Sequence, residues 1–173
     1  TMYLLPELNL RLRPTILNMK PGTRVTSHQF TMGDWEADES AEIEFRTAYL
    51  WIVPARVGGN WSLRDSAGLS FGINLNQTFH KIGGDATVGG ARQPLVGATL
   101  RGDELRFAFN DDKGVTRTFT GRINGNQLTG TVRAAGGGET MDVGRDLGVP
   151  VADYPTTGGA IEGDVRHVSI TFD

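Results

Sequence analysis

Leu69-Ser-Phe-Gly-Ile-Asn-Leu-Asn76 is the stretch that decides the fold class of this 173-residue chain. Its apolar residues alternate with small or polar ones, and Leu105-Arg-Phe-Ala-Phe-Asn110 alternates in the same way. A period of two is typical of a β-strand with one buried and one solvated face. A sheet of such strands has to curl on itself or pack against another layer to bury its apolar face.

Turn signals separate the apolar runs throughout residues 41–134. They are Gly58-Gly59, Gly83-Gly84, Gly89-Gly90, Asp111-Asp-Lys-Gly114 and Asn124-Gly125. The repeated pattern of Leu100-Arg-Gly-Asp-Glu-Leu105 and Ile123-Asn-Gly-Asn-Gln-Leu128 favours two successive tight hairpins. Much of the excess in the 24 glycines is thereby explained. The sequence predicts a mainly β fold, an antiparallel meander curled into a sandwich or a partly open barrel.

The N-terminal region has a different texture and predicts a short αβ unit. Pro14 is suited to the first position of a helix over Thr15-Ile-Leu-Asn-Met-Lys20, and Pro21-Gly22 would end it. Residues 23–30 are rich in β-branched side chains and predict a strand. The acidic stretch 31–42 is expected to be a surface loop.

These changes in composition and apolar periodicity predict three regions. Residues 1–56 form the αβ remnant, and residues 57–138 form the antiparallel β domain. Residues 139–173 form a glycine-rich tail, in which 165–172 alternates and is a possible edge strand.

Composition narrows the class of protein. A hydrophobic content of 38% and a charged content of 21% indicate a globular chain, and a net charge of -3 gives no reason to expect nucleic acid as a partner. The absence of cysteine favours a reducing cytoplasm. The longest apolar run, Tyr49-Leu-Trp-Ile-Val-Pro-Ala55, is far too short to cross a bilayer, and no export signal is recognisable.

No motif of the sequence supplies a self-sufficient catalytic site. His28, His80 and His167 lack ligand spacing, so we expect no metal site. Phosphate loops, nucleophile elbows and dinucleotide fingerprints are missing, so we expect no catalytic residue. Aromatic residues could line a ligand pocket inside a curled sheet, although filling of the core is the favoured interpretation. The pocket candidates are Trp51, Trp61, Phe71, Phe107 and Phe109.

Residues 3–35 carry a family resemblance. The segments Tyr3-Leu-Leu-Pro-Glu-Leu-Asn-Leu-Arg-Leu-Arg-Pro14 and Lys20-Pro-Gly-Thr-Arg-Val25, with Gly33-Asp-Trp35 after them, are similar to class I S-adenosylmethionine-dependent methyltransferases. The branch they resemble is bacterial and similar to lysine methyltransferases. In that family Leu-Leu-Pro follows the fourth strand and Pro-Gly-Thr-Arg-Val opens the fifth. The resemblance covers about the first 60 residues and extends to about 134.

The resemblance is to the C-terminal part of such an enzyme, without its cofactor-binding half. The family holds the methyl donor with a glycine-rich loop after its first strand and an acidic residue at the end of its second, and neither has a counterpart in this sequence. The carried-over cleft wall is the segment after the fourth strand, Tyr3, Leu4, Leu5, Pro6 and Asn9. We therefore expect no cofactor for this chain alone, and S-adenosylmethionine only if a partner supplies the other half.

Three functions remain open at this point. The first is a β-rich binding or assembly module that is not catalytic alone and that self-associates through a sheet edge at 23–30 or 2–6. The second is a lipocalin-like binder of an apolar ligand in the mouth of the curled sheet. The third is a methyltransferase that is active only with a partner chain supplying the cofactor half.

Overall fold

The computed structural model describes residues 1–64, 70–135 and 141–144. It confirms a mainly β, antiparallel fold with a short N-terminal helix. The chain divides into two compact units: Thr1–Ala55 with Arg101–Asp103, and Arg56–Leu100 with Glu104–Asp173. Within the described ranges, no helix has the length and apolar character needed to cross a membrane.

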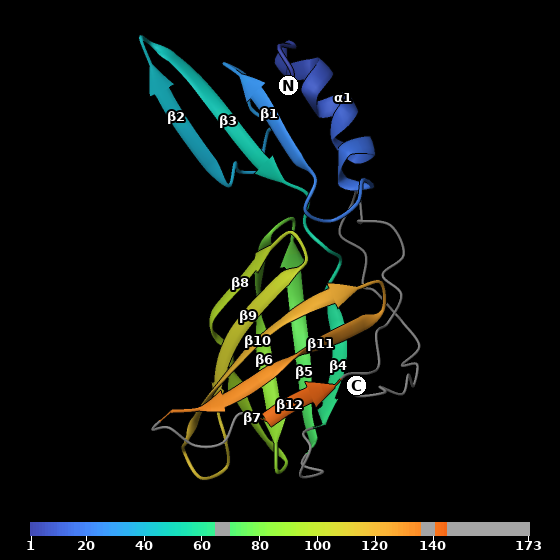
Figure 1. Cartoon of the computed structure of the whole chain (residues 1–173), viewed down its shortest axis with the longest axis vertical. Coiled ribbons are helices and arrows are strands. Elements are labelled where there is room, and N and C mark those ends of the chain that lie inside the picture. The colour runs from blue at the N-terminus through green and yellow to red at the C-terminus, as the bar shows by residue number, and fades with distance from the viewer. Residues whose placement is uncertain (65–69, 136–140, 145–173) are drawn as a thin grey trace. The chain divides into compact units, whose positions relative to one another are not determined.

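The first unit is a three-stranded sheet with a helix beside it (Figure 1). Its elements are α1 (Pro6–Leu17), β1 (Arg24–His28), β2 (Glu39–Ile43) and β3 (Arg46–Ile52). The sheet order is β1-β3-β2, with both pairs antiparallel. Met2 adds a parallel bridge to Ser27 on the free side of β1. The predicted helix-turn-strand unit is therefore present, and the predicted strand at 23–30 is confirmed as β1.

The predicted start of the helix was wrong. The helix begins at Pro6, which occupies the first helical position, so Pro14 lies inside the helix. The leucines of the Leu-Arg alternation, Leu8, Leu10 and Leu12, each remain about 40% exposed, which is why the sequence shows no clean helical period.

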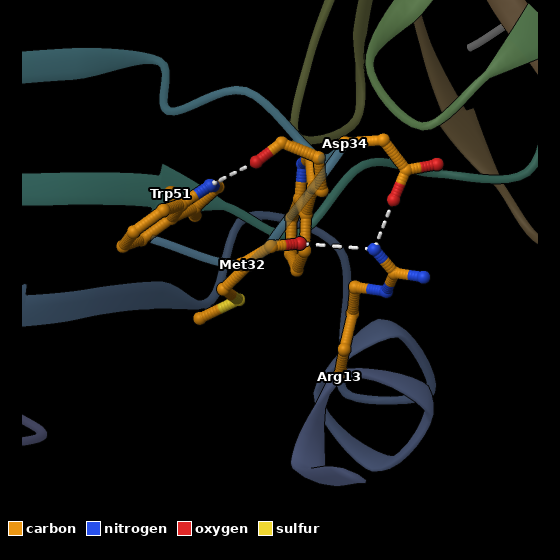
Figure 2. Close-up of polar contacts among 5 residues, drawn as sticks. Arg13, Met32, Asp34 and Trp51 are labelled. Atoms are coloured by element: carbon orange, nitrogen blue, oxygen red, sulfur yellow. Dashed lines mark hydrogen bonds and ion pairs between the residues drawn. The ribbon is translucent and has the colours of Figure 1, made fainter. Parts of the chain in front are cut away.

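The stretch 31–42 is not simply a surface loop. Met32 and Trp35 are fully buried, and β2 begins at Glu39. Figure 2 shows how this segment is held: Arg13 donates to the Met32 carbonyl oxygen at 2.9 Å and pairs with Asp34, while the Trp51 indole donates to the Trp35 carbonyl oxygen at 2.9 Å. The Arg13 hydrogen bond, first among its causes, lowers the pKa of Asp34. The acidic composition of this stretch predicted a solvated loop, and for that reason Met32 and Trp35 were not recognised as core residues.

The second unit is a single sheet of two consecutive meanders (Figure 1). The first meander is β4 (Gly59–Arg64), β5 (Ser70–Thr78), β6 (Lys81–Val88) and β7 (Ala91–Pro94); the second is β8 (Val96–Arg101), β9 (Glu104–Asn110), β10 (Thr116–Asn124), β11 (Gln127–Ala134) and β12 (Met141–Gly144). The sheet order is β7-β6-β5-β4-β12-β11-β10-β9-β8. Gly144 and Arg64 pair where the meanders join.

The sheet curls to bury one face. Phe71 of β5 and Phe109 of β9 meet edge to face at 5.4 Å, and Phe107 stacks on Phe119 at 4.9 Å between ring centroids. β7 also approaches β9, yet β7 and β8 remain the two ends of the described sheet, so it is not a closed barrel. Strand β12 falls inside the stretch predicted as a tail, whereas the predicted edge strand 165–172 lies outside the described residues.

The repeated hairpin pattern is confirmed. Gly102 and Gly125 occupy the turns of the β8–β9 and β10–β11 hairpins, with φ of 61° and 59°. The predicted turn at Gly83-Gly84 is wrong because both glycines lie inside β6, and the chain reverses at Phe79-His80 instead. Gly84 is required there for a different reason: a Cβ at this position would lie 1.9 Å from the Asn74 carbonyl oxygen of β5, and its φ is 143°.

Replacing Gly84 with alanine should lower the free energy of unfolding by about 2–4 kcal/mol, because β5 and β6 would be forced apart. The neighbouring Gly83 is the matched control, since a Cβ there meets nothing within 4 Å. Gly83→Ala should change stability by no more than about 0.5 kcal/mol. Urea unfolding of both variants makes the comparison, and equal stabilities would contradict the close strand approach.

One buried ion pair holds the turn between β9 and β10. The Asp111 carboxylate, 4% exposed, accepts hydrogen bonds from the Lys113 and Val115 amides and pairs with Arg117 at 2.9 Å. The Arg117 guanidinium lies 5.9 Å from the Phe71 ring centroid. Burial is the largest single influence on the Asp111 pKa and raises it, but the hydrogen bonds from Val115, Arg117 and Lys113 together outweigh burial and lower the pKa.

Because its folded-state pKa is lowered, Asp111 stabilises the fold at pH values above the unfolded pKa, and this stabilisation disappears as the pH falls through the folded pKa. Asp111→Asn should lower the free energy of unfolding by about 3 kcal/mol at pH 7, with a difference from wild type that shrinks below about pH 4. Exposed Asp112→Asn is the control. Urea unfolding at several pH values tests this, and a pH-independent difference would contradict it.

Candidate functional site

The candidate site lies where two parallel segments end. The Met2 amide donates to the Thr26 carbonyl oxygen at 2.8 Å, and the His28 amide donates to the Met2 carbonyl oxygen at 3.0 Å. This pairing sets the segment at Met2 parallel to β1, so both run toward the same edge of the sheet. In α/β sheets, ligands bind outside the carboxyl ends of parallel strands.

A hollow of about 540 Å³ opens at this edge, lined by Tyr3, His28, Gln29 and Arg46. The Tyr3 ring centroid lies 5.1 Å from that of His28 and 5.9 Å from that of Phe30. Tyr3 follows the parallel bridge, His28 and Gln29 are the last residue of β1 and the next one, and Arg46 opens β3. The lining combines a phenol, an imidazole, an amide and a guanidinium.

The hollow faces away from α1. In β1 the buried residues Val25 and Ser27 alternate with Thr26 and His28, and Asn9 of α1 donates to Ser27. His28 therefore lies on the other face of the sheet, together with Ala48, its partner on β3, and Arg46 two residues earlier. Helix α1 is the only helix of the described residues, so in the described part this second face carries no helical layer.

Left-handed backbone is concentrated around the hollow. Gln29 has a φ of 69°, and Glu44 and Phe45, which form the β2–β3 turn directly before Arg46, have φ of 48° and 64°. Non-glycine residues rarely adopt this conformation. Phe45 is also 96% exposed at the tip of the hairpin. Two-residue hairpin turns commonly have positive φ at both residues, so Glu44 and Phe45 follow from the β2–β3 turn, and Gln29 is the residue whose conformation points to the hollow.

The predicted cleft-wall residues separate onto different surfaces. Tyr3 lines the hollow, Leu4 is half-buried, and Leu5 and Pro6 are exposed at the start of α1. Asn9 is fully buried on the α1 face. Its amide group donates to the carbonyl oxygens of Phe30 and Thr31 at 3.4 and 3.2 Å.

The aromatic pocket candidates also lie apart. Trp51 belongs to the first unit, where its ring centroid lies 6.3 Å from that of Trp35. Trp61, Phe71, Phe107 and Phe109 belong to the second unit and are at most 5% exposed. Phe71 and Phe107 both contact Phe109, so these rings fill space between the strands by packing on one another.

Sequence reasoning missed three of the four lining residues. His28 and Gln29 could have been found from their position at the end of a predicted strand that follows a helix, where ligand-binding side chains gather. Arg46 had no comparable signal, because its place depends on a β2–β3 hairpin hidden in an acidic stretch. In the described ranges, no group of three or more histidine or carboxylate side chains could hold a metal ion.

Comparison with known proteins gives a partial match. The chain is 38% identical over 58 residues to a protein-lysine N-methyltransferase of Saccharolobus islandicus, which covers 31% of this chain and 36% of that protein. A solved structure of an RNA methyltransferase from Salinibacter ruber, in complex with S-adenosyl-L-homocysteine, is 43% identical over 32% of this chain and 37% of its own, with a TM-score of 0.31. No family model matches.

The chain thus spans little more than a third of each relative's length. Over about a third of its own length, it is similar to methyltransferases.

Asn9 is the one predicted cleft residue whose contacts allow a stability test. Asn9→Ala should lower the free energy of unfolding by about 1–3 kcal/mol, because the carbonyl groups of Phe30 and Thr31 lose their donor inside the unit. Thr15→Ala on the exposed side of α1 is the control, with a change within about 0.5 kcal/mol. Urea unfolding measures both. An unchanged free energy of unfolding in Asn9→Ala would show that Asn9 does not stabilise the first unit.

Proposed function

We propose that this chain contributes the C-terminal strands and the substrate-side wall of an S-adenosylmethionine-dependent methyltransferase, whose donor-binding half is supplied by other residues. The observation that carries the proposal is the second face of the first unit's sheet. It bears the hollow and has no helical layer among the described residues.

The three strands of this sheet are antiparallel, and Met2 adds the parallel bridge. Antiparallel sheets can leave one face in water, whereas sheets with parallel strands and crossover helices are normally covered on both faces, so it is the parallel bridge that favours a covered second face. In this unit α1 covers only the Ser27 face. β1 is already paired with β3 and Met2, so the outer edges of the sheet are the Met2 segment and β2. A further parallel strand beside Met2, with helices on the bare face, would complete the architecture and close the hollow from one side.

We infer that the described residues do not form a donor site by themselves. Binding of a nucleoside cofactor to such a fold uses a glycine-rich loop that leads into a helix N-terminus. Here α1 is preceded by Leu5 and begins with Pro6. The glycine pairs of the described residues lie at the start of β4, within β6 and in the β6–β7 turn. We therefore assign no step of methyl transfer to this chain alone. Its residues position and select the substrate.

The similarity to a protein-lysine N-methyltransferase over 58 residues supports this role. Roughly two thirds of that relative lies outside the matched region, which is room for the donor-binding part. This part can precede the chain in one polypeptide or belong to a separate one. Self-association through the Met2 edge is the competing assembly, and sedimentation velocity distinguishes it.

Calorimetric titration should detect no saturable binding of S-adenosylmethionine to residues 1–173 alone. Binding and methyl transfer should appear when a donor-binding half is present, in the same polypeptide or added separately. Saturable binding to the isolated chain would contradict the proposal.

Ala48→Arg places a large charge on the bare face and should weaken binding of a separately added half by about tenfold or more. Val96→Arg, at an exposed residue of the second unit, is the matched control and should leave that affinity unchanged. Equal effects of the two substitutions would show that the bare face is not the docking surface.

A further inference from the structure

We propose that the hollow at Tyr3, His28, Gln29 and Arg46 selects a substrate with a carboxylate or phosphate group next to an aromatic ring. This inference rests on the proposed function, because it names the substrate class of the same site. It is carried by the chemistry of the four lining residues, of which Arg46 bears the only full positive charge and none bears a carboxylate.

Arg46 is an available cation. None of the ion pairs or side-chain hydrogen bonds among the described residues involves its guanidinium, whereas Arg13 and Arg101 of the same unit pair with Asp34 and Glu39. A guanidinium presents a planar fork of donors that fits carboxylate and phosphate oxygens. Arg46 can therefore bind an oxyanion without first breaking an internal ion pair.

Gln29 is oriented to donate. Its side-chain oxygen accepts a hydrogen bond from the backbone amide of Thr47 at 3.0 Å. The backbone amide of Gln29 donates to the Thr47 carbonyl oxygen at 2.7 Å. These two contacts anchor Gln29 against the start of β3 in its left-handed conformation. The free end of the side chain is then its NH₂ group, which is a donor to oxyanions.

Tyr3 and His28 supply a surface for the rest of the substrate. Their rings are inclined at 44° with centroids 5.1 Å apart, and Tyr3 is 69% exposed. Ring faces and edges of this kind contact planar apolar groups favourably. The hollow thus offers an aromatic surface beside a cluster of donors.

The same arrangement disfavours a lysine ammonium group. A cation would lie beside Arg46 without a carboxylate in the lining to compensate it. Glu42 pairs across from Thr47 and so lies on the opposite face to Arg46, and Glu44 belongs to the turn outside the lining. The inferred substrate class therefore differs from the lysine side chain named for the Saccharolobus relative.

The test is a nuclear magnetic resonance titration of residues 1–173, in a buffer free of phosphate and carboxylate. The probes are benzoate, phenyl phosphate and benzylamine, which share an aromatic ring and differ in charge. The ring signals of Tyr3 and His28 are followed as each probe is added. The benzoate and phenyl phosphate arms separate a carboxylate preference from a phosphate preference.

We expect saturable shifts of the Tyr3 and His28 signals with at least one anionic probe, and affinity for benzylamine at least about tenfold weaker. Arg46→Gln should weaken the affinity of the protein for the anionic probe by about tenfold or more. Arg24→Gln is the matched control, because Arg24 is an exposed arginine on the same face of β1 outside the lining. It should leave the affinity unchanged.

Three results would overturn the inference: no saturable shift with either anion, equal binding of benzylamine, or equal losses in the two arginine variants. The measurement uses no methyl donor and no second half. If neither anion binds, the proposal that a donor-binding half completes the enzyme is unaffected. If the donor-binding half does not restore cofactor binding, a positive anion titration still supports the substrate class.

Discussion

Two main-chain hydrogen bonds between Met2 and β1 determine the geometry of the candidate site. They align the segment at Met2 with β1, so the residues that follow each of them emerge at one edge. An antiparallel arrangement would have placed Tyr3 and His28 at opposite ends. Because side chains alternate along both segments, the same pairing also places Tyr3 on the face away from α1, where Arg46 of β3 completes the lining.

The framework around this pairing combines buried polar contacts with an apolar core that includes Met32, Trp35 and Trp51. Asn9 connects α1 to the residues after β1, and Arg13 connects α1 to Met32 and Asp34. The second unit is built differently, with stacked phenylalanines and one buried ion pair at a turn. These two modes of stabilisation suit different tasks: a polar framework fixes the positions of individual side chains, while a packed aromatic core stabilises the sheet as a whole.

The β meander was predictable because each strand bears its apolar residues on one face, as Phe71, Ile73 and Leu75 do in β5. Hairpins at Gly102 and Gly125 were predictable because turn geometry demands glycine there. Gly83-Gly84 misled for the opposite reason: glycine also permits close approach of two backbones, and sequence alone does not separate these uses. The site was largely beyond prediction, because Arg46 reaches Tyr3 through strand order and not through any local pattern.

The acidic strand β2 makes the two margins of the first sheet chemically different. Its residues Glu39 and Glu42 are exposed on the outermost strand, where charge discourages a further strand from adding. The opposite margin, at Met2, bears no charged side chain among Thr1, Met2 and Tyr3. The charge on β2 disfavours an added strand at that margin, whereas the Met2 margin lacks this charge. Charge on one margin alone therefore acts against strand-by-strand growth of this sheet in both directions.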